Sequence, residues 1–319
     1  MTSQRLPATG RGSAPGKIIL FGEHAVVYGR LAIAIPVHDL QATATIRSDG
    51  RADRWQLNAT VLEAPADLAD LPTDDPLGAI VRNTLVELGC ERPAGEIAVE
   101  SDIPVASGLG SGAAVSTAIV RALAAHFGAR LPDRIVSELV FEVEKIHHGT
   151  PSGIDNTVVA FGRPVCFRRR DAIEALPVAQ PFTIAIADSG VAASTRLAVE
   201  GVAQRRAVDP VRFEALFDSM EDIARRAAVA IRSGAPDELG ALMDENHRCL
   251  QAIGVSTAGL DALASAARDA GALGAKLSGG GLGGNVIALV SAARSADVQS
   301  ALLRAGAKRV YITQVPADA

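Results

Sequence analysis

The 319-residue sequence has few aromatic residues, few cysteines and no long hydrophobic run, and each shortage excludes a class of protein. Aromatic side chains make up only 3% of the chain, so its core has to be built from Ala, Val, Leu and Ile. The three cysteines are too widely spaced for a zinc site or a disulfide framework. The longest apolar runs, residues 113–120 and 286–293, are far shorter than the roughly 20 residues that a membrane helix needs. Because the N-terminal residues also lack the apolar core of a signal peptide, we expect a globular protein in the cytoplasm.

Basic residues are outnumbered by acidic residues, and lysine is much rarer than arginine. The formal net charge of −5 argues against a protein that binds nucleic acid or anionic membranes without specificity. Only four of the 31 basic residues are lysines, and Lys17, Lys145 and Lys276 each lie beside a glycine-rich or acidic motif. An arginine-rich chain that keeps a lysine at such a place indicates a need for a compact ammonium group, although chance retention explains any single one.

The pattern of apolar residues predicts an α+β protein of two domains, residues 1–180 and 181–319, with the boundary in the polar, proline-containing segment 163–181. Strands are expected at 17–21, 32–37, 41–46, 55–61, 96–101, 182–188, 275–277, 285–290 and 309–315. Helices are expected at 76–88, 113–127, 134–148, 210–233, 236–253, 257–270 and 295–305. Asp209 and Ser256 are the expected N-caps of two of these helices, and Gly149 is expected to follow the end of helix 134–148.

The strongest signal for chemistry is a glycine-rich loop that runs directly into a helix. Gly108, Gly110 and Gly112 alternate with other residues before the apolar helix 113–127. Glycines allow the backbone to approach a ligand closely, and the unpaired N–H groups and dipole of a helix N-terminus favour an anion. Ser107 and Ser111 add hydroxyl groups. We therefore favour phosphate binding over the alternative of a tight strand-to-helix turn.

Two further glycine motifs do not fit familiar nucleotide loops. Lys17 follows Gly16 and enters an apolar strand, but Arg11 and Ile18 stand where a Walker A loop needs Gly and Ser or Thr. Gly279, Gly281 and Gly284 match the spacing G-x-G-x-x-G, but a strand follows them, whereas the dinucleotide fingerprint needs a helix. The third motif is then either a loop that wraps a ligand or a flexible hairpin connection.

Two carboxylates complete the set. Glu144 lies about one turn from the end of the helix 134–148, and Asp155 follows the turn after it. Either residue alone would be an ordinary surface acid. Beside an anion-binding loop, however, two carboxylates suit one Mg²⁺ ligand and one group that handles a proton.

In this order, the three glycine motifs and the two acids resemble the GHMP small-molecule kinases, over residues 15–285. Residues 22–29 (GEHAVVYG) and 146–156 (IHHGTPSGIDN) are most similar to the mevalonate kinase branch of that family. The resemblance implies a two-domain α+β fold with the active site in the cleft between the domains. The N-terminal domain would be a mixed α/β domain similar to domain 2 of ribosomal protein S5, and the C-terminal domain a ferredoxin-like α/β sandwich.

The resemblance also implies ATP and Mg²⁺ as cofactors and a role for each motif residue. Asp155 would be the catalytic base with Lys17 beside it, and Glu144, with Ser111 as a further ligand, would bind the metal. The implied nucleotide contacts are Ser101, Pro104, Ser107, Gly108, Leu109, Gly110, Ser111, Gly112 and Ala113. The implied substrate contacts are Glu23, His24, Gly279, Gly280 and Gly281.

Two of the loops depart from the family pattern. Gly112 replaces a serine that often contacts Mg²⁺, and Leu282 and Asn285 replace a glycine and a cysteine of the third loop. The implied reaction is the ATP-dependent phosphorylation of the 5-hydroxyl of (R)-mevalonate to 5-phosphomevalonate, an early step toward isoprenoids. The alternatives are a phosphomevalonate kinase, a mevalonate 3-kinase, or a non-catalytic relative that binds nucleotide and a small ligand. No nucleic-acid or membrane partner is expected, and a homodimer is left open.

Overall fold

The computed structural model describes residues 9–48, 54–59, 64–90, 94–105, 107–148, 151–169, 171 and 173–318, without the side chains of His147 and His148. The chain forms two compact units whose segments interleave. Unit 1 consists of Met1–Gly16, Leu40–Val105 and Gly110–Gly162, and unit 2 of Lys17–Asp39, Ala106–Leu109 and Arg163–Ala319. The division of the sequence at residue 180 stays a prediction. No helix within the described ranges is long and apolar enough to cross a membrane.

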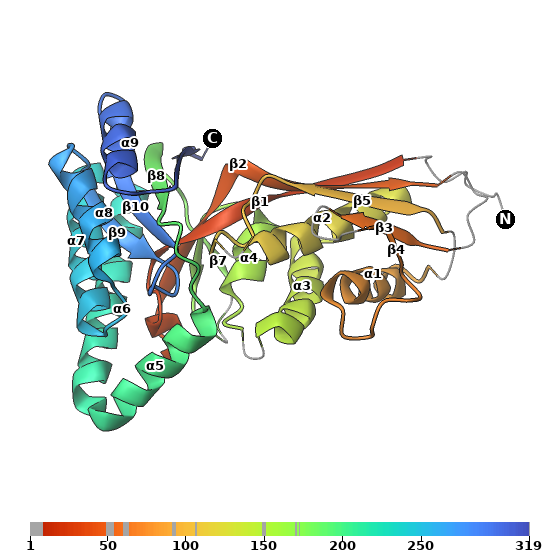
Figure 1. Ribbon diagram of the computed structural model, residues 1–319, viewed down its shortest axis with the longest axis horizontal. Coiled ribbons are helices and arrows are strands. Elements are labelled where there is room, and N and C mark those ends of the chain that lie inside the picture. The colour runs from red at the N-terminus through yellow and green to blue at the C-terminus, as the bar shows by residue number, and fades with distance from the viewer. Residues whose placement is uncertain are drawn as a thin grey trace. The chain divides into compact units, whose positions relative to one another are not determined.

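Unit 1 is a sheet with helices on one of its sides (Figure 1). Its strands follow the order β4 (Ala66–Asp67), β3 (Gln56–Ala59), β5 (Glu96–Ser101) and the later part of β2 (Ala32–Arg47), and β1 (Thr9–Phe21) also pairs with β2. Strands β2 and β5 are antiparallel, with Ala44 opposite Val99, whereas β3 and β5 are parallel. The helices are α1 (Pro76–Glu87), α2 (Ser111–His126), α3 (Asp133–His148) and α4 (Ile154–Phe161).

Helix α2 packs closely on the first part of β1 because two residues of the strand, Gly10 and Gly12, have no side chain that would hold the helix away. A Cβ atom added at Gly10 would lie 2.6 Å from the Cβ of His126, and one added at Gly12 would collide with the carbonyl oxygen of Ala118. Ile119 and Leu123, at the spacing of four that predicted this helix, are fully buried. The helix that begins at the glycine-rich loop is therefore held rigidly in the unit.

Unit 2 contains an antiparallel sheet in the order β11-β8-β10-β9, formed by β11 (Arg309–Val315), β8 (Phe182–Asp188), β10 (Asn285–Val290) and β9 (Gly274–Ser278). Its helices are α5 (Thr195–Val208), α6 (Pro210–Ser233), α7 (Pro236–Ala252), α8 (Ala258–Asp269) and α9 (Ser295–Arg304). Alternate strand residues, such as Leu277 and Val286, join Phe217 of α6 in the apolar core between the sheet and these helices. The unit also includes the 3-10 turn Ala25–Tyr28, the start of β2, and strands β6 (Val165–Phe167) and β7 (Glu174–Ala175).

Strand β9 is an edge strand, and side chains from α7 and α8 occupy its free edge. Asp244 accepts a hydrogen bond from the N–H of Ala275 (2.9 Å), and Arg268 donates to the carbonyl of the same residue (2.7 Å). His247 Nδ1 accepts from the N–H of Leu277 at 3.3 Å. Covering an edge in this way satisfies its backbone groups and prevents another strand from pairing with it. It also fixes the strand that leads into the third glycine motif.

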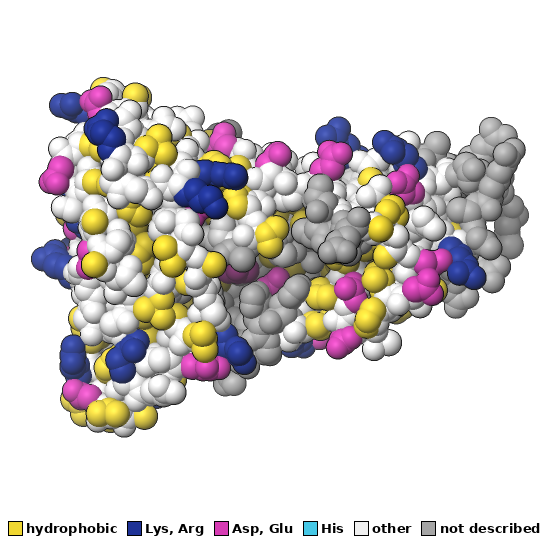
Figure 2. All heavy atoms as spheres, in the orientation of Figure 1, with side chains coloured by type: hydrophobic (Ala, Val, Ile, Leu, Met, Phe, Trp, Pro, Cys, Tyr) yellow, Lys and Arg dark blue, Asp and Glu magenta, His cyan; other side chains and the backbone are white. Residues whose placement is uncertain are grey.

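Basic and acidic side chains are both scattered over the face in Figure 2. On α6, Arg225 pairs with Glu221 at 3.0 Å, and Arg226 pairs with Asp222 at 3.6 Å and with Glu245 of α7 at 3.3 Å. These arginines are therefore neutralised locally by neighbouring carboxylates.

Most of the expected elements are present, and the errors have identifiable causes. Asp209 caps α6 as expected, but Thr257 rather than Ser256 caps α8, because the Ser256 hydroxyl donates to Asp261 at 2.6 Å instead. The strands expected at 32–37 and 41–46 form one continuous strand, β2. Six of the elements were not expected: the 3-10 turn Ala25–Tyr28, β4, α4, α5, β6 and β7. Gly149 and Thr150, at the expected end of the helix before α4, lie outside the described residues.

Candidate active site

The glycine-rich loop ends at the N-terminus of α2, in unit 1. Gly110 is the N-cap residue and adopts a left-handed conformation (φ 75°), which glycine reaches without steric cost. Ser111 and Gly112 form the first turn, and Ala113 is buried beneath them. The first amides of this 16-residue helix and its dipole are the elements of an anion-binding site.

Glu144 lies directly beside this turn. Its side chain is only 5% exposed, and its Oε1 atom is 3.4 Å from the position that a Cβ atom on Gly112 would take. The structure therefore brings together a carboxylate from α3 and the start of α2, as the sequence predicted. The absence of a side chain at position 112 leaves room next to the carboxylate oxygen.

Asp155 lies in the first turn of α4, behind Gly153, which is left-handed (φ 94°). It is half-buried. Two contacts inside unit 1 hold α4 in place. Asn156 Nδ2 donates to the Ser137 hydroxyl at 2.9 Å, and Arg121 donates to the Ala160 carbonyl at 2.7 Å. The helix that carries Asp155 is thus tied to α2 and α3, the helices that carry Gly112 and Glu144.

The other predicted nucleotide contacts of unit 1 lie at the end of β5. Ser101 is half-buried, and its hydroxyl accepts a hydrogen bond from the N–H of Ile103 at 3.2 Å. Pro104 is half-buried as well, and the adjacent Val105 is 70% exposed. This short segment leads directly into the glycine-rich loop.

The residues of unit 1 fit a magnesium ion better than a metal that needs a complete protein cage. Among the described residues, no three His, Cys, Asp or Glu side chains gather into a metal-binding group. Mg²⁺ in phosphoryl-transfer enzymes keeps several waters and takes only one or two carboxylates together with phosphate oxygens. Glu144, beside a glycine at a helix N-terminus, meets that requirement.

In unit 2, the first part of the glycine-rich loop is clamped by hydrogen bonds at two of its carbonyl groups. The N–H of Lys17 donates to the carbonyl of Leu109 at 2.9 Å, and Asn285 Nδ2 donates to the carbonyl of Ser107 at 2.5 Å. Gly108, between them, is exposed and left-handed (φ 77°). Lys17 itself is only 4% exposed. The lysine motif, the loop and the end of the third glycine motif therefore meet within this unit.

Glu23 and His24 are both buried in unit 2. The carboxylate of Glu23 pairs with the ammonium of Lys276, and both side chains are 0% exposed. His24 has a left-handed backbone (φ 59°), and its Nε2 lies 2.9 Å from the carbonyl oxygen of Gly280. A carbonyl only accepts hydrogen bonds, so Nε2 carries the proton and Nδ1 is left as an acceptor. Burial lowers the pKa of His24 to about 4, which keeps the ring neutral at physiological pH.

The third glycine motif is a fixed loop rather than a loose hairpin connection. The N–H groups of Leu282 and Gly284 donate to the carbonyls of Val255 (2.8 Å) and Val191 (2.9 Å). Gly279 and Gly281 are left-handed, and a side chain on Gly281 would collide with the carbonyl of Val255. The motif residues predicted to contact substrate, Gly279, Gly280 and Gly281, thus lie next to His24 through its contact with Gly280.

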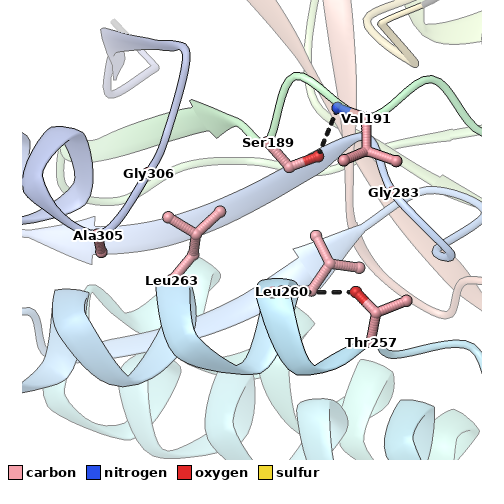
Figure 3. Close-up of a pocket in the computed structure, with 9 residues that line it drawn as sticks. Ser189, Val191, Thr257, Leu260, Leu263, Gly283, Ala305 and Gly306 are labelled. Carbon is pink, nitrogen blue, oxygen red and sulfur yellow. Dashed lines mark hydrogen bonds between the residues drawn. The ribbon is translucent and has the colours of Figure 1, made fainter.

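A small pocket of unit 2 lies beside Gly283 of the third glycine motif (Figure 3). Uncharged residues line it: Ser189, Val191, Thr257, Gly259, Leu260, Leu263, Gly283, Ala305 and Gly306.

Analysis of the sequence missed three residues that shape the site: Asn246, Lys276 and Asn285. Lys276 had given a signal as one of the few lysines in an arginine-rich chain, and Asn285 as a departure from the family pattern, but neither was assigned a role. The lysine signal applies to Lys17 and Lys276, which are buried, but not to Lys145, whose side chain is 42% exposed and pairs with Glu142 at 2.5 Å.

Comparison with known proteins agrees with this geometry. Residues 77–163 match the family GHMP kinases N terminal domain, and residues 227–308 match GHMP kinases C terminal. The chain is 35% identical to the mevalonate kinase of Thermococcus sibiricus over 92% of both chains, and 35% identical to that of Aeropyrum pernix over 88% of both. This chain belongs to the GHMP kinase family.

Solved structures of mevalonate kinases match the fold of this chain along its whole length. The structure of L. major mevalonate kinase in complex with R-mevalonate matches this chain with a TM-score of 0.87 and 28% identity, over 100% of both chains. The Methanococcus jannaschii mevalonate kinase shares the fold, with a TM-score of 0.83 and 24% identity. The expected two-domain GHMP kinase fold of α+β type is therefore confirmed.

Proposed function

We propose that this GHMP kinase transfers the γ-phosphoryl group of ATP to the 5-hydroxyl of (R)-mevalonate. The observation that carries the proposal is the 35% identity to curated mevalonate kinases over 92% of the chain. The mevalonate-bound structural neighbour, at 28% identity, supports the same substrate. A carboxylate beside a helix N-terminus in unit 1, and a neutral histidine beside a glycine loop in unit 2, are consistent with this reaction.

In the proposed reaction, the protein mainly positions the reactants and offsets charge. The first amides of α2 and the glycines of the loop bind the phosphates of ATP. When bound, Mg²⁺ neutralises charge on the β- and γ-phosphates, and Glu144, with Ser111 nearby on α2, would hold it.

Asp155 accepts the proton of the 5-hydroxyl of mevalonate while the oxygen of that hydroxyl bonds to the γ-phosphorus of ATP. At the same time, the bond between the γ-phosphorus and the bridging β-phosphate oxygen breaks, and ADP leaves. In this proposal, Lys17 supplies a compact ammonium that stabilises the negative charge of the transferred group.

On the substrate side, we propose that His24 and the loop Gly279–Gly281 border mevalonate. Because His24 uses Nε2 to donate to Gly280, its Nδ1 is available to accept a hydrogen bond. A neutral ring with an acceptor nitrogen suits a hydroxyl group of the substrate. We still expect a cytoplasmic location, and a homodimer stays open as the sequence left it.

A coupled ADP-release assay tests the proposal across mevalonate, phosphomevalonate, galactose and homoserine, with ³¹P NMR of the product. We expect rapid Mg²⁺-dependent ADP release with mevalonate and a phosphomonoester on its C5 oxygen. Faster turnover of phosphomevalonate, or a phosphoryl group on the C3 oxygen, would assign the chain to another kinase of the family. No release above background with any acceptor would favour the non-catalytic relative.

A further inference from the structure

Among the described residues, the two most deeply buried charged side chains belong to a cluster that the proposed chemistry does not use. Lys276 on β9 donates to Glu23 Oε1 and to the carbonyl of Leu277 (2.8 Å), and Asn246 Nδ2 on α7 donates to Glu23 Oε2 at 3.1 Å. The ring of Phe21 lies 6.0 Å from the ammonium. Both carboxylate oxygens and most of the ammonium's hydrogen-bonding capacity are thus engaged within unit 2.

Stability alone does not explain this cluster. Removing two charges from water costs several kcal/mol for each ion, and well-packed apolar residues of similar size are often as stable as a buried ion pair or more so. Burial also lowers the pKa of Lys276, which reflects the same desolvation. With 0% exposure, neither Glu23 nor Lys276 can touch a ligand in this structure. Any effect on function must therefore pass through neighbouring groups.

Both partners lie next to the contact between His24 and Gly280. Glu23 immediately precedes His24, whose left-handed backbone (φ 59°) is unfavourable for a residue with a side chain. Such a conformation persists only where its surroundings fix it. Lys276 lies in the strand that leads into Gly280, the residue whose carbonyl accepts from His24. The ion pair therefore connects the two segments from which the histidine and the glycine loop project.

We propose that Glu23, Lys276 and Asn246 are positioning residues that hold His24 against Gly280 and so pre-form the substrate-binding side of the site; this inference rests on the proposed function. Asn246 orients the side chain of Glu23, because its hydrogen bond to Oε2 fixes the plane of the carboxylate. The cluster would act on substrate binding more than on the chemical step, since none of its members touches the reacting atoms.

The variants for the test are chosen to separate positioning from stability. Lys276→Met alone leaves a buried carboxylate unpaired, so it is expected to destabilise unit 2 strongly. The double variant Glu23→Gln with Lys276→Met contains no unpaired charge, and the new amide group can still donate to Asn246 Oδ1, which has no partner in the structure. Asn246→Ala keeps the ion pair and removes only the bond to Oε2, so it serves if the double variant does not fold.

The matched control is the pair Asp244 and Arg268, which contacts the same strand at Ala275. The double variant Asp244→Asn with Arg268→Met removes an ion pair from β9 but leaves Glu23 and His24 untouched. A purely structural role predicts similar effects of the two double variants on every readout.

Two readouts are measured. In steady-state kinetics, we expect the Glu23/Lys276 double variant to raise the KM for mevalonate at least about tenfold, with kcat and the KM for ATP within roughly threefold of the parent. In ¹⁵N–¹H NMR of the substrate-free protein, we expect the pKa of His24, assigned with a His24→Gln variant, to move from about 4 toward 6.5, because the loss of burial, the largest cause of its low pKa, outweighs the loss of the hydrogen bond to Gly280. Asn246→Ala should shift both readouts in the same direction by less, and the control should shift neither.

The proposal is overturned if either readout keeps its parent value in the variant that folds, or if the control moves both equally. Failure of the proposed function is distinguishable from this outcome. If the parent protein does not phosphorylate mevalonate, the kinetic comparison is lost, but the titration of His24 needs no substrate and decides the positioning role by itself.

Discussion

In unit 1, the residues proposed for chemistry lie at helix ends: Gly110–Gly112 at the start of α2, Glu144 near the end of α3 and Asp155 at the start of α4. In unit 2, the residues of the site lie on loops, strands and helix α7 and are joined by side-chain hydrogen bonds, as in the cluster of Glu23, Lys276 and Asn246. The first arrangement presents backbone amides and carboxylates to a ligand. The second arrangement fixes the conformation of the loops that carry His24 and Gly280.

This difference separates two kinds of consequence. A change of charge at a helix end of unit 1 alters the electrostatics of phosphoryl transfer and leaves the packing of α2, α3 and α4 largely intact. A change within the hydrogen-bonded network of unit 2 alters which conformations its loops adopt, so it affects binding and stability together. Apart from Lys17, we therefore expect kcat and metal dependence to respond in unit 1, and KM and stability in unit 2.

The largest expected effect is that of Asp155→Asn, which keeps the shape of the side chain and removes its charge. Because general-base catalysis typically contributes about 10²–10⁴-fold, we expect kcat to fall by that factor, with the KM for ATP within about threefold of the parent. Steady-state kinetics with mevalonate and ATP measure both quantities.

The control for Asp155→Asn is Asp133→Asn, the same change at a partly exposed acid in the first turn of α3. It should keep kcat within about twofold of the parent, since surface substitutions rarely matter. Turnover of the Asp155 variant within tenfold of the parent would contradict its role as the base and weaken the contrast between the two units.

In unit 2, Asn285→Asp should have the next largest effect. The aspartate cannot donate to the carbonyl of Ser107, and it adds a charge at a site that is only 1% exposed. We expect the KM for ATP to rise about tenfold or more and the free energy of unfolding to fall by about 1–3 kcal/mol. Kinetics and chemical denaturation measure the two effects.

Thr313→Val is the matched control for this change. It removes a buried hydroxyl from β11, in the same sheet, that has no hydrogen-bond partner. It should leave the KM for ATP unchanged and the stability equal or higher. If Asn285→Asp weakens the protein but leaves the KM for ATP at its parent value, the bond to Ser107 serves the fold and not the phosphate loop.

The same contrast explains what the sequence could predict. Helix α2 and strand β10 follow from local pattern, because Ile119 and Leu123 recur at helical spacing and residues 285–290 form a short apolar run. The glycine loop and its two acids also follow from adjacency in the chain. The α5 helix does not, because only Ala198 and Val202 of its 14 residues are buried, so it carries no apolar face that a pattern would reveal.

The hydrogen-bonded cluster of Glu23, Lys276 and Asn246 could not be predicted from the sequence for a different reason. Glu23 and Lys276 are 253 residues apart, and no spacing rule connects positions so far from each other. Glu23 was expected to contact the substrate, whereas the structure engages both of its carboxylate oxygens within the protein. Only tertiary contacts reveal that Glu23 is engaged by Lys276 and Asn246 and that its neighbour His24 contacts Gly280.

A smaller effect, back in unit 1, is expected from Gly112→Ser, which places a hydroxyl beside Glu144 Oε1. Because an added oxygen ligand raises affinity for Mg²⁺, we expect the Mg²⁺ concentration at half-maximal rate to fall by roughly threefold to tenfold. Gly112→Ala adds the Cβ atom alone and should not lower it. Equal Mg²⁺ titrations for the Ser variant and the parent would show that the metal is not held at this position.

The smallest effect concerns Leu282, which is 41% exposed and held in a left-handed conformation (φ 60°) within the third glycine loop. Asparagine tolerates this conformation better than leucine, and little buried apolar surface is lost. We therefore expect Leu282→Asn to stabilise the protein by about 1 kcal/mol, or about 2 °C in Tm, with kcat unchanged. Val191→Asn makes the same kind of change at a neighbouring exposed residue without a positive φ, so it should give no gain. A rise in the KM for mevalonate in Leu282→Asn, at unchanged or higher Tm, would instead show that the leucine contacts the substrate, and would extend the binding side of unit 2 beyond His24.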